Sequence, residues 1–580
     1  MMNFAQIGVL SSLVLLIAVL IHGRVQTGMA FTLLALGYYA TGLIDQEHLI
    51  TSYANSSLVA LVLLMLVSVA LEKTVLLDQI GAKLLSGSYR MVLLRLMSVT
   101  SVISGFLNNT AVVASLLGII SQNKRFAPSR LLIPLSYSAL FGGTLTLIGT
   151  STNLMVNGFA EQAGMAPLGL FSFALVGVPV VIVCIIVMML LSRWLLPDNK
   201  VEETKLGSYF LEAQVESGSS LIGKSVLDNQ LRSLDGLFLV EILRGPHLVS
   251  PVEPGEIIEA GDILIFAGEV DRIHLLNRFD GLSLFQAPLN VLQSNLVEVV
   301  VVADSPLVDR TIRDVNFRAL FDAAVVGIRR GERRLSGKIG TIPLKAGDSL
   351  TLAVGPDFAS RRNLDRNFYL LKGGTRQPRL NTKQSYSVFI GFVGVIVLAA
   401  INAVPLVMGL AFLIVALLGI KFVSVDELRR RFPFELVLVI GSALALSHVM
   451  TSSGLASLAA TALSDALQGH SALWALIAIY LTTLALTELM SNNAAAAMVF
   501  PIAFSLAQSM GVSPLPFVMA LVFGASASFI TPFGYQTHLM VYTPGRYRFM
   551  DFVRIGVPVS VAYSATVLTV LPFAFPFHPQ

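Results

Sequence analysis

The sequence predicts a polytopic α-helical membrane protein. Its two apolar halves are expected to be inverted repeats, each with five spans and one re-entrant helical hairpin, around a cytosolic α+β insert. Only 13% of the 580 residues are charged, against about 25% in soluble domains, and the mean hydropathy is +0.76. Of the 74 charged residues, 46 lie in the segment 197–380. A polar insert therefore separates two halves that contain several stretches of about 18–25 apolar residues.

Composition also excludes other classes of protein. The net charge of +4 is small and the basic residues follow loops, so no nucleic-acid partner is expected. The single cysteine, Cys184, excludes an internal disulfide and lies in an apolar run, where a small core or lipid-facing residue is expected. We find no metal-ligand cluster, no nucleophile–base pair and no dinucleotide motif, so neither an enzyme nor an organic cofactor is predicted.

The first half, residues 1–196, contains five predicted spans. They are expected near 4–22, 25–44, 55–77, 128–164 and 170–194. The first run lacks a basic start and a small-residue cleavage site, so we interpret it as a span rather than a signal peptide. Basic residues in short loops favour the cytoplasmic side. Arg90 and Arg95 therefore place their loop inside and the N-terminus outside.

The stretch 91–123 predicts a re-entrant hairpin. Basic residues flank both of its ends, namely Arg90, Arg95, Arg125 and Arg130, whereas its middle holds Asn108-Asn109-Thr110. A hairpin that enters from the cytoplasm, turns at mid-membrane and leaves the same way fits this pattern, because polar backbone at that depth needs protein or water around it. Two short spans joined by a polar kink are the alternative.

The second half, residues 384–580, repeats the pattern. Its spans are predicted near 386–403, 405–422, 434–452, 515–549 and 552–577. A second hairpin is predicted over 471–510, with Ser491-Asn492-Asn493 at its turn. Counting five crossings per half, the first half starts outside and the second starts inside. The halves are then inverted repeats, which is typical of secondary transporters.

Two polar blocks carry the repeat at the level of single residues. Phe106–Ala111 aligns with Leu489–Ala494 at an offset of 383. Thr146–Val156 aligns with Thr531–Val541 at an offset of 385. Both blocks are polar inside apolar surroundings, so their coincidence indicates a true duplication.

The insert is duplicated as well, and two domains are predicted over 205–285 and 291–375. At an offset of 86, Arg244-Gly245 aligns with Arg330-Gly331 and Gly261-Asp262 with Gly347-Asp348. Each copy alternates short β-like runs with one helical stretch. The predicted runs are Leu237–Leu243, Ile263–Ala267, Ala324–Ile328 and Ser349–Val354.

The side chains at the two hairpin tips are neutral and polar. They are Asn108, Asn109, Thr110, Ser491, Asn492 and Asn493. Helix N-termini at a tip offer N–H donors and a positive dipole end, which suit an anion, while carbonyl and hydroxyl oxygens suit a hard cation such as Na⁺. Without Lys or Arg, a bound anion is costly in a low dielectric unless cations bind beside it, so cation–anion symport is favoured over uniport. The alternative is that these side chains merely cap broken helices.

A few other polar residues lie inside the apolar runs. Ser104 and Thr487 each fall about one helical turn before a tip. Their hydroxyls either complete an oxygen shell or bond back to a carbonyl of their own helix. Glu488, His448 and His538 are functional candidates because ionisable groups are rare in spans, although Glu488 could equally accept from backbone donors at the tip.

The tip motifs and the paired breaks at Gly149–Asn153 and Gly534–His538 resemble those of the divalent anion:sodium symporters (DASS). The family tip motif is Ser-Asn-Thr, from which each half departs at one residue. The two-copy insert resembles the TrkA-C (RCK_C) domains of one subgroup, and the resemblance covers nearly the whole chain. The run Gly534–Tyr542 is more similar to the sulfate transporters than to the dicarboxylate carriers, although His538 stands where that subgroup usually has Asn.

The resemblance implies a set of ligands, position by position. One Na⁺ is assigned to Ser104, Asn109 and Gly149, and the other to Thr487, Asn492 and Gly534. Further Na⁺ candidates at the same motifs are Asn108, Thr152, Ser491 and Thr537. The anion is assigned to Asn109, Thr110, Asn492 and Asn493. The resemblance also implies a homodimer in which the hairpin-bearing part moves as an elevator.

These observations together predict a Na⁺-coupled symporter of a divalent oxyanion, with sulfate as the expected substrate. A di- or tricarboxylate symporter is the alternative. A channel gated by its RCK-like domains is disfavoured because no Thr-Val-Gly-Tyr-Gly filter occurs. The protein is expected in the plasma membrane (the bacterial inner membrane), with the insert in the cytoplasm and both termini outside. A small ligand such as a nucleotide is expected on the TrkA-C-like domains.

Overall fold

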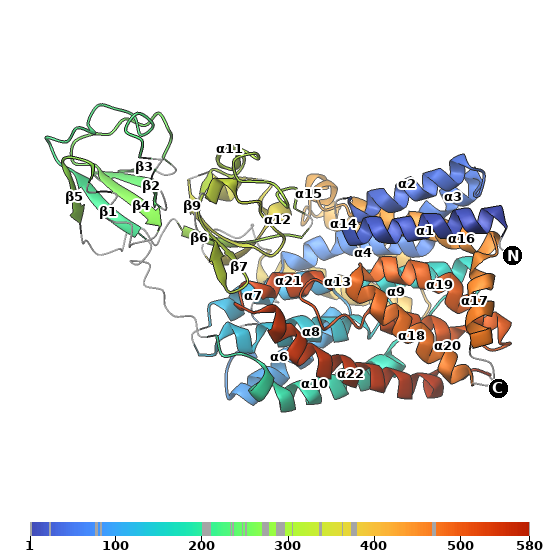
Figure 1. Cartoon of the computed structure of the whole chain (residues 1–580). Helices are drawn as coiled ribbons and strands as arrows, with labels where there is room; N and C mark the ends of the chain where they lie inside the picture. The colour runs from blue at the N-terminus through green and yellow to red at the C-terminus, as the bar shows by residue number, and fades with distance from the viewer. Residues whose placement is uncertain are drawn as a thin grey trace.

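The structure is a computed structural model of the chain (Figure 1). It describes residues 3–578 apart from 23–24, 76–78, 80, 82–83, 124, 200–209, 232–233, 235–236, 246, 250–251, 269–275, 277, 286–295, 304, 336–338, 356, 362, 373–379 and 467–470. Long helices run side by side in one bundle, and two β-sheets lie at one end of it (Figure 1). The start of α1 and the end of α22 lie at the opposite end.

The first half is helical. Its elements are α1 (Phe4–His22), α2 (Thr27–Ala40), α3 (Gln46–Tyr53), α4 (Ser56–Glu72), α6 (Tyr89–Ser104), α7 (Asn109–Ser121), η1 (Pro128–Arg130), α8 (Leu132–Gly143), α9 (Ser151–Gln162) and α10 (Ala174–Leu195). Cys184 is buried on α10, which agrees with a core position. The short helix α3 was not predicted, because its eight residues are too polar to resemble a span.

The second half is built from a similar series. Its elements are α13 (Thr382–Ala400), α14 (Leu406–Gly419), α15 (Val425–Arg430), α16 (Phe434–Ser452), α17 (Leu455–Ala466), α18 (Ala472–Leu489), α19 (Asn492–Ser509), α20 (Pro514–Ala525), α21 (Gln536–Tyr542) and α22 (Phe549–Ala574). Helix α17 was missed by the sequence analysis. It follows α16 after a turn at Gly454, whose φ of +76° suits a residue without a side chain.

Two predicted spans are interrupted in the structure. The predicted span 128–164 is divided between α8, which ends at Gly143, and α9, which begins at Ser151, so the predicted break at Gly149–Asn153 lies at this division. The second, 515–549, is likewise divided between α20 and α21. The Asn153 side chain donates to the carbonyls of Gly143 (3.1 Å) and Thr146 (2.8 Å). This amide therefore satisfies carbonyl groups that the break leaves without helical partners.

Helix pairs occupy the two predicted hairpins. Helices α6 and α7 meet at residues 105–108, inside the predicted 91–123, and α18 and α19 meet at residues 490–491, inside 471–510. Each second helix begins at a polar N-cap, as expected where a chain re-enters a helix within an apolar surrounding. The breaks thus lie at the sequence motifs that predicted them.

Several helices are long and apolar enough to cross a membrane. Among the described residues these are Gln46–Glu72, Ala174–Leu195, Thr382–Ala400, Phe434–Ser452, Ala472–Leu489 and Phe549–Ala574. Shorter apolar helices, including α14 and α20, pack with them in one continuous apolar core. The chain is therefore a multi-pass helical membrane protein.

In the described residues of the insert, the strands form two five-stranded antiparallel sheets. The first consists of β1 (Phe210–Val215), β2 (Leu237–Arg244), β3 (His247–Val249), β4 (Ile263–Gly268) and β5 (Leu282–Phe285), in the order β3-β2-β4-β1-β5. The second consists of β6 (Leu296–Val301), β7 (Ala323–Arg330), β8 (Arg333–Leu335), β9 (Ser349–Val354) and β10 (Phe368–Lys372), in the order β10-β6-β9-β7-β8. The second unit also holds α11 (Phe317–Phe321), α12 (Leu364–Asn367), η5 (Ile339–Thr341) and η6 (Phe358–Ser360).

Equivalent strands occupy equivalent places in the two sheets. The same ion pair also occurs in both units. The Arg244 guanidinium binds Asp262 (Nε to Oδ1, 2.9 Å), and that of Arg330 binds Asp348 (2.7 Å). Each sheet has its own apolar core. The β-runs predicted from the sequence are found as β2, β4, β7 and β9. The domain boundaries stay a prediction, and positions 205, 291 and 375 lie outside the described residues.

Candidate functional site

The first hairpin tip is organised around Asn109, the first residue of α7. The buried Ser104 hydroxyl, at the end of α6, donates to Asn109 Oδ1 at 2.6 Å. Asn109 Nδ2 donates to the hydroxyl of Tyr535, 3.0 Å away in the break before α21. The amide therefore contacts its own hairpin with its oxygen and the other half of the chain with its nitrogen.

The second tip reproduces this arrangement. The Thr487 hydroxyl, fully buried in α18, lies 2.7 Å from Asn492 Oδ1 and 2.8 Å from the Ala525 carbonyl. Neither Ser104 nor Thr487 donates to a carbonyl of its own helix in the described structure, so the back-bonding alternative is not what is observed. The next residue, Asn493, crosses to the first half. Its Oδ1 accepts from Thr152 Oγ1 at 2.9 Å.

Two tip residues act as helix caps. Asn108 Oδ1 accepts from the N–H of Thr110 at 2.9 Å, and Ser491 Oγ accepts from the N–H of Ala494 at 3.3 Å. Such bonds satisfy N–H groups that a helix start leaves free. The capping alternative therefore describes Asn108 and Ser491, whereas Asn109 and Asn492 do not cap.

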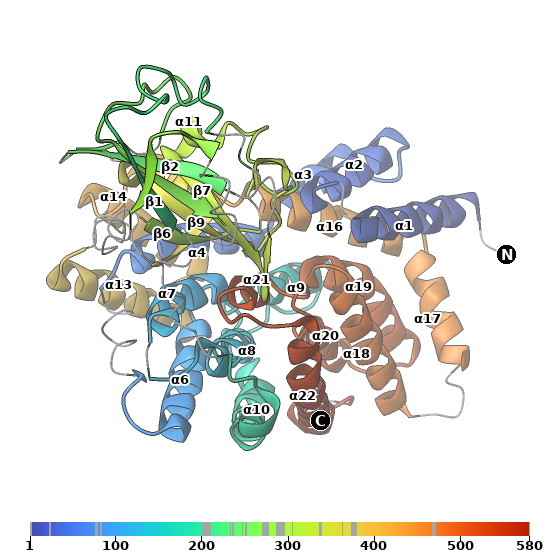
Figure 2. The same ribbon diagram turned by 60° about the vertical axis from the view of Figure 1, so that its left-hand side comes forward.

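The contacts between tips and breaks bring the two halves of the chain together. Figure 2 shows α7, α21, α9 and α19 next to one another at the centre of the molecule, and α7 packs on α21 as α19 packs on α9. Thr110 Oγ1 lies 3.5 Å from Gln536 Oε1 at the edge of this region. The N-terminus of α7 contacts that of α21, and the N-terminus of α9 contacts that of α19, in each case through neutral side chains. The region thus offers helix dipoles, amides and hydroxyls to a ligand.

Glycines allow the breaks to approach the tips. A Cβ on Gly143 would lie 3.0 Å from Asn109 Nδ2, and a Cβ on Gly149 would lie 2.5 Å from the Gly143 carbonyl oxygen. A larger residue at either position would displace the tip or the break. Gly143 thus lies between the Asn109 amide and the Gly149 backbone.

Thr537 and His538 make contacts away from the tips. Ser136 Oγ on α8 lies 2.7 Å from both Thr537 Oγ1 and His538 Nδ1. His538 Nε2 lies 2.9 Å from the Ser528 carbonyl, which can only accept, so Nε2 carries the proton and Nδ1 accepts in the neutral ring. Both side chains are fully buried. Thr537 and His538 thus join α21 to α8, and the Thr537 hydroxyl lies at Ser136 rather than at the second tip.

Comparison with known proteins identifies the family of this chain. Residues 13–522 match the CitMHS family, described as citrate transporters. The chain belongs to this family. It is 32% identical to a putative sulfur deprivation response regulator of Chlamydomonas reinhardtii, over 93% of this chain and 96% of that protein. An uncharacterized transporter of Synechocystis is 31% identical over 91% of each chain.

The name of a further relative gives the ions that it transports. It is sodium/sulfate cotransporter 1 of C. reinhardtii, 30% identical over 63% of this chain and 43% of that protein. The family and these transporter relatives make the chain a membrane transporter and not an enzyme.

The sequence analysis of this transporter missed several residues of the site. Tyr535, Ser151 and Gln536 contact the tips, and Asn153 holds the first break together. All four lie inside the aligned polar blocks, so the repeat was the available signal. Their partners could not be chosen from it, because the alignment pairs Tyr535 with Thr150 and not with Asn109.

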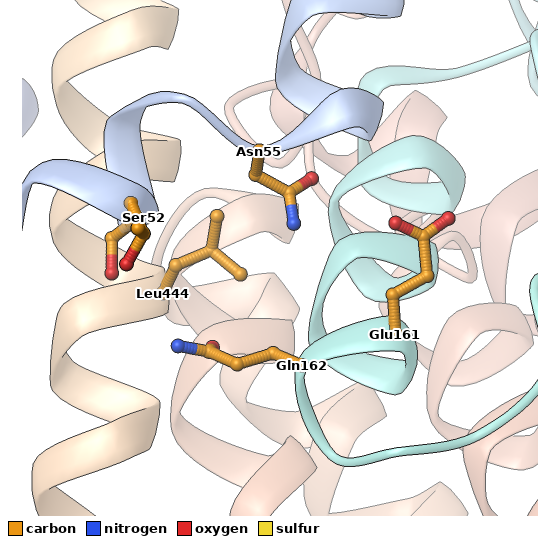
Figure 3. Close-up of a pocket in the computed structure, with 6 residues that line it drawn as sticks. Ser52, Asn55, Glu161, Gln162 and Leu444 are labelled. Atoms are coloured by element: carbon orange, nitrogen blue, oxygen red, sulfur yellow. The ribbon is translucent and has the colours of Figure 1, made fainter. Parts of the chain in front are cut away.

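A second polar region of the transporter lies at the end of the bundle remote from the sheets. A cavity of about 220 Å³ is lined by Thr51, Ser52, Asn55, Glu161, Gln162 and Leu444 (Figure 3). Glu161, near the end of α9, accepts from Ser56 Oγ and from Asn157 Nδ2, each at 2.8 Å. This carboxylate is thus held by neutral donors, which joins α9 to the start of α4.

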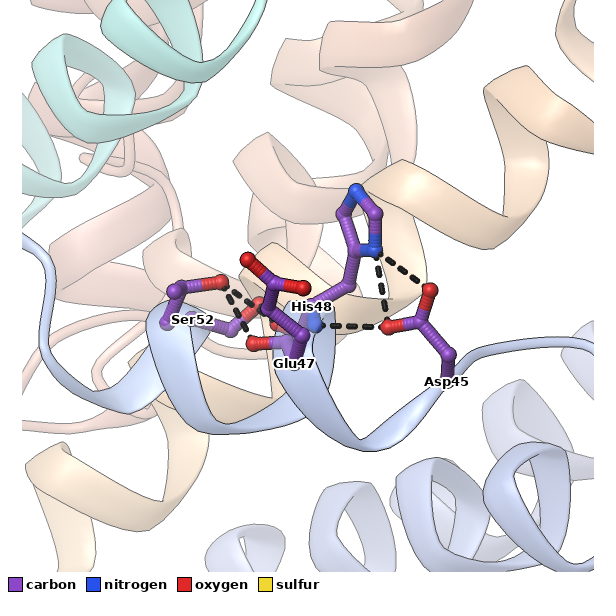
Figure 4. Close-up of polar contacts among 5 residues, drawn as sticks. Asp45, Glu47, His48 and Ser52 are labelled. Atoms are coloured by element: carbon purple, nitrogen blue, oxygen red, sulfur yellow. Dashed lines mark hydrogen bonds and ion pairs between the residues drawn. The ribbon is translucent and has the colours of Figure 1, made fainter.

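Beside that cavity, Asp45 caps the start of α3. The Asp45 carboxylate accepts from the N–H of His48 at 2.7 Å and lies 2.8 Å from its Nδ1 (Figure 4). These hydrogen bonds lower the pKa of Asp45. The His48 ring stacks on His448 of α16, with centroids 4.3 Å apart. His448 is thus paired with a ring at the opposite end from the insert and lies outside the tip contacts.

Proposed function

We propose that this transporter is a Na⁺-coupled symporter of a divalent oxyanion, with sulfate as its substrate. The observation that carries this proposal is the pair of crossed contacts, Asn109 to Tyr535 and Asn493 to Thr152. They place the polar motifs of both halves around one region that contains amide, hydroxyl and helix N-terminal groups. An anion held by such groups gains from cations bound next to it, because the groups carry no positive charge.

The anion would be held by Asn109, Thr110, Asn492 and Asn493. The amide nitrogens of the three asparagines, the Thr110 hydroxyl and the N–H groups of the two helix starts are donors, which a sulfate dianion requires. Asn109 and Asn493 already contact the opposite half, so both halves would contribute to one substrate.

The two cations would be held by matched oxygen sets. Ser104 with Asn109 and Thr487 with Asn492 form equivalent hydroxyl–amide pairs, at 2.6 and 2.7 Å. The backbone carbonyls of Gly149 and Gly534 would complete them, since Na⁺ takes oxygen ligands as other hard cations do. Asn108 and Ser491 cap helices and Thr537 bonds to Ser136. Thr152 donates to Asn493. We therefore place none of these four residues in the two Na⁺ ligand sets.

Relatives support sulfate, and the family description supports the alternative. The alignment with the sodium/sulfate cotransporter covers 63% of this chain and 43% of the cotransporter. A di- or tricarboxylate is the second candidate because the matching family is described as citrate transporters. Uptake of radiolabelled sulfate into proteoliposomes, competed by thiosulfate, phosphate, succinate and citrate, separates the two. Competition by thiosulfate alone supports sulfate, whereas competition by citrate or succinate alone supports the carboxylates.

The two halves are proposed to be inverted repeats, and the exchange of packing partners supports this. Helix α2 packs on α16 as α14 packs on α4, and the last helices of each half, α10 and α22, pack on each other. A pseudo-two-fold axis in the membrane plane produces such an exchange. The homodimer and the elevator movement rest on the resemblance to divalent anion:sodium symporters.

The insert is proposed to be a cytosolic pair of TrkA-C-like domains that bind a small ligand such as a nucleotide and regulate transport. Its second unit contacts the end of α21. The N–H of Gly331 donates to Thr543 Oγ1 at 3.1 Å, Thr543 Oγ1 donates to the Gly347 carbonyl at 2.5 Å, and Arg548 pairs with Glu332. Helix α21 has seven residues, with Thr543 at its C-terminal end and Tyr535 as its N-cap. A movement of the insert at Thr543 would therefore be transmitted along this one helix to Tyr535. Both chain ends lie remote from the sheets (Figure 1), which supports termini outside the cell.

A further inference from the structure

The loop between α20 and α21 holds buried oxygens that lack partners. Ser526 Oγ and Ser528 Oγ are buried without a hydrogen-bond partner among the described residues, and Thr531 Oγ1 and Glu488 Oε2 lie close to each other there without a hydrogen bond of good geometry. Ser528 is 0% exposed. Buried polar atoms in native proteins are nearly always satisfied by protein, water or an ion. These oxygens, gathered near one loop, can therefore serve as ligands of an ion.

Three of these oxygens face the same space, beside the α-carbon of Gly534. A Cβ built on Gly534 would lie 2.0 Å from Ser528 Oγ, 3.1 Å from Thr531 Oγ1 and 3.4 Å from Glu488 Oε2. Any residue other than glycine would collide with the Ser528 hydroxyl. The other carboxylate oxygen, Glu488 Oε1, accepts from the N–H of Ile530 at 3.1 Å, which holds the carboxylate against the loop and leaves Oε2 directed at the space.

The corresponding place in the first half is closed. The repeat alignment puts Gly105 at the position of Glu488, Gly143 at that of Ser528 and Thr146 at that of Thr531. There the Thr146 hydroxyl donates to the Gly105 carbonyl, and a Cβ on Gly149 would meet the backbone of Gly143. The carboxylate and the unpartnered hydroxyls are therefore particular to the second half.

The side chains of Glu488, Ser528 and Thr531 are also distinct from the Thr487–Asn492 pair, although both groups lie near Gly534. Thr487 and Asn492 bond to each other, and Thr487 bonds to the Ala525 carbonyl, whereas none of these atoms contacts Glu488 Oε2 in the described structure. The carboxylate of Glu488, the next residue after Thr487, thus accepts from the loop at Ile530 rather than from Asn492.

We propose that Glu488, Ser528 and Thr531 form an additional cation site beside Gly534, occupied by a monovalent ion, Na⁺, during transport. One carboxylate and two hydroxyls are hard oxygen donors, and a single negative charge balances a monovalent ion. A buried carboxylate without a counter-charge is costly, so binding a cation stabilises the ionised form. This inference rests on the proposed Na⁺ coupling and adds one ion to it.

The test measures bound Na⁺ and transported charge separately. We compare wild type with Glu488→Gln, which keeps the side-chain size, and with Ser528→Ala/Thr531→Val, which keeps the carboxylate. In ²²Na⁺ equilibrium binding to purified transporter, both variants are expected to bind about one Na⁺ fewer per chain than wild type. In proteoliposomes, the charge moved per sulfate is expected to fall by about one unit in both. Glu161→Gln is the matched control, because both of its oxygens have neutral donors, and it should keep the wild-type count.

Two results would overturn the site. Equal Na⁺ counts in wild type and in all variants that keep their thermal stability contradict it. A loss of charge in Glu488→Gln without loss of bound Na⁺ shows that the carboxylate carries a proton instead. The proposed function itself fails only if uptake by the wild-type protein does not depend on Na⁺. Equal Na⁺ counts in wild type and variants would not give that result, so the two failures can be distinguished.

Discussion

Asn109 Nδ2 donates to the Tyr535 hydroxyl at 3.0 Å, and this bond joins the tip of the first hairpin to the break in the second half. Its counterpart joins Thr152, in the first half, to Asn493 at the second tip. Neither hairpin is therefore complete without the other half of the chain. A ligand between the tips would be contacted by residues more than 380 positions apart in the sequence.

Tyr535→Phe is expected to weaken sulfate binding moderately. The change removes the acceptor of Asn109 Nδ2 and keeps the ring, so the expected loss is about 0.5–1.5 kcal/mol, or roughly 2–13-fold in half-saturation. Sulfate uptake kinetics measure it. Tyr39→Phe, an exposed tyrosine on α2, is the matched control and should behave as wild type. An unchanged half-saturation in Tyr535→Phe would show that the crossed contact does not support the site.

Asn109→Ala and Asn492→Ala are expected to affect transport more strongly and equally. Each removes a buried amide from equivalent positions, a loss of about 1–3 kcal/mol or roughly 5–150-fold in affinity. Asn→Asp should be worse, because it places a negative charge beside a dianion. The control is Asn402→Gly rather than alanine, since Asn402 has a φ of +55°. If both Ala variants reach the membrane and keep wild-type half-saturation and Na⁺ dependence, the amides do not bind substrate.

Gly347→Ala tests the contact of the insert with α21. Gly347 has a φ of +80°, and its Cβ would lie 2.9 Å from the Leu539 carbonyl oxygen. In the first unit the equivalent Gly261 has a φ of +84° but nothing within 4 Å. Both alanine variants carry the same backbone strain, of about 1–3 kcal/mol, but only Gly347→Ala should change the maximal rate of uptake. Equal rates in the two variants would mean that the insert does not control α21.

The ion pair between Lys73 and Glu427 is expected to hold the two halves together at the insert end of the bundle. Lys73 Nζ lies 2.8 Å from Glu427 Oε1, and both side chains are mostly buried. Burial raises the pKa of Glu427, but hydrogen bonds from Lys73 and Ser424 outweigh this and lower it. The pair therefore stabilises the fold above about pH 4.5, and its contribution is lost as the pH falls through the lowered pKa.

Lys73→Met provides the measurement. It leaves the carboxylate without its partner, so we expect a loss of about 1–3 kcal/mol at pH 7, seen as a lower melting temperature in detergent. This difference from wild type should shrink as the pH falls below about 4. Glu47→Gln, on the exposed side of α3 (Figure 4), is the control. A difference that does not depend on pH would exclude the ion pair as its cause.

Much of the fold was predictable because hydrophobic length and polar interruptions are visible in the sequence. The span at 434–452 and both hairpin tips were placed correctly. The breaks within 128–164 and 515–549 were visible as motifs but not as helix ends, because Asn153 stabilises the first break by a contact within the folded chain. Helix α17 has only 12 residues and is therefore too short to be recognised in a window suited to membrane spans.

The candidate site was predictable to a smaller extent. Duplication singled out Asn109 and Asn492, since equivalent positions in two halves indicate a shared role. It could not show that Asn108 and Ser491 cap helices or that Thr537 faces Ser136. Those outcomes depend on side-chain direction, and direction at a helix break is fixed by tertiary packing rather than by periodicity.

Sulfate accumulation driven by a Na⁺ gradient tests the central claim most directly. Purified transporter in proteoliposomes is given radiolabelled sulfate with Na⁺ outside, or with choline outside and no pH gradient. The proposed function predicts that sulfate accumulates above its external concentration only with the inward Na⁺ gradient, and that Asn109→Ala and Asn492→Ala both weaken this. Equal uptake in choline, with no accumulation above equilibrium, would contradict cation-coupled transport.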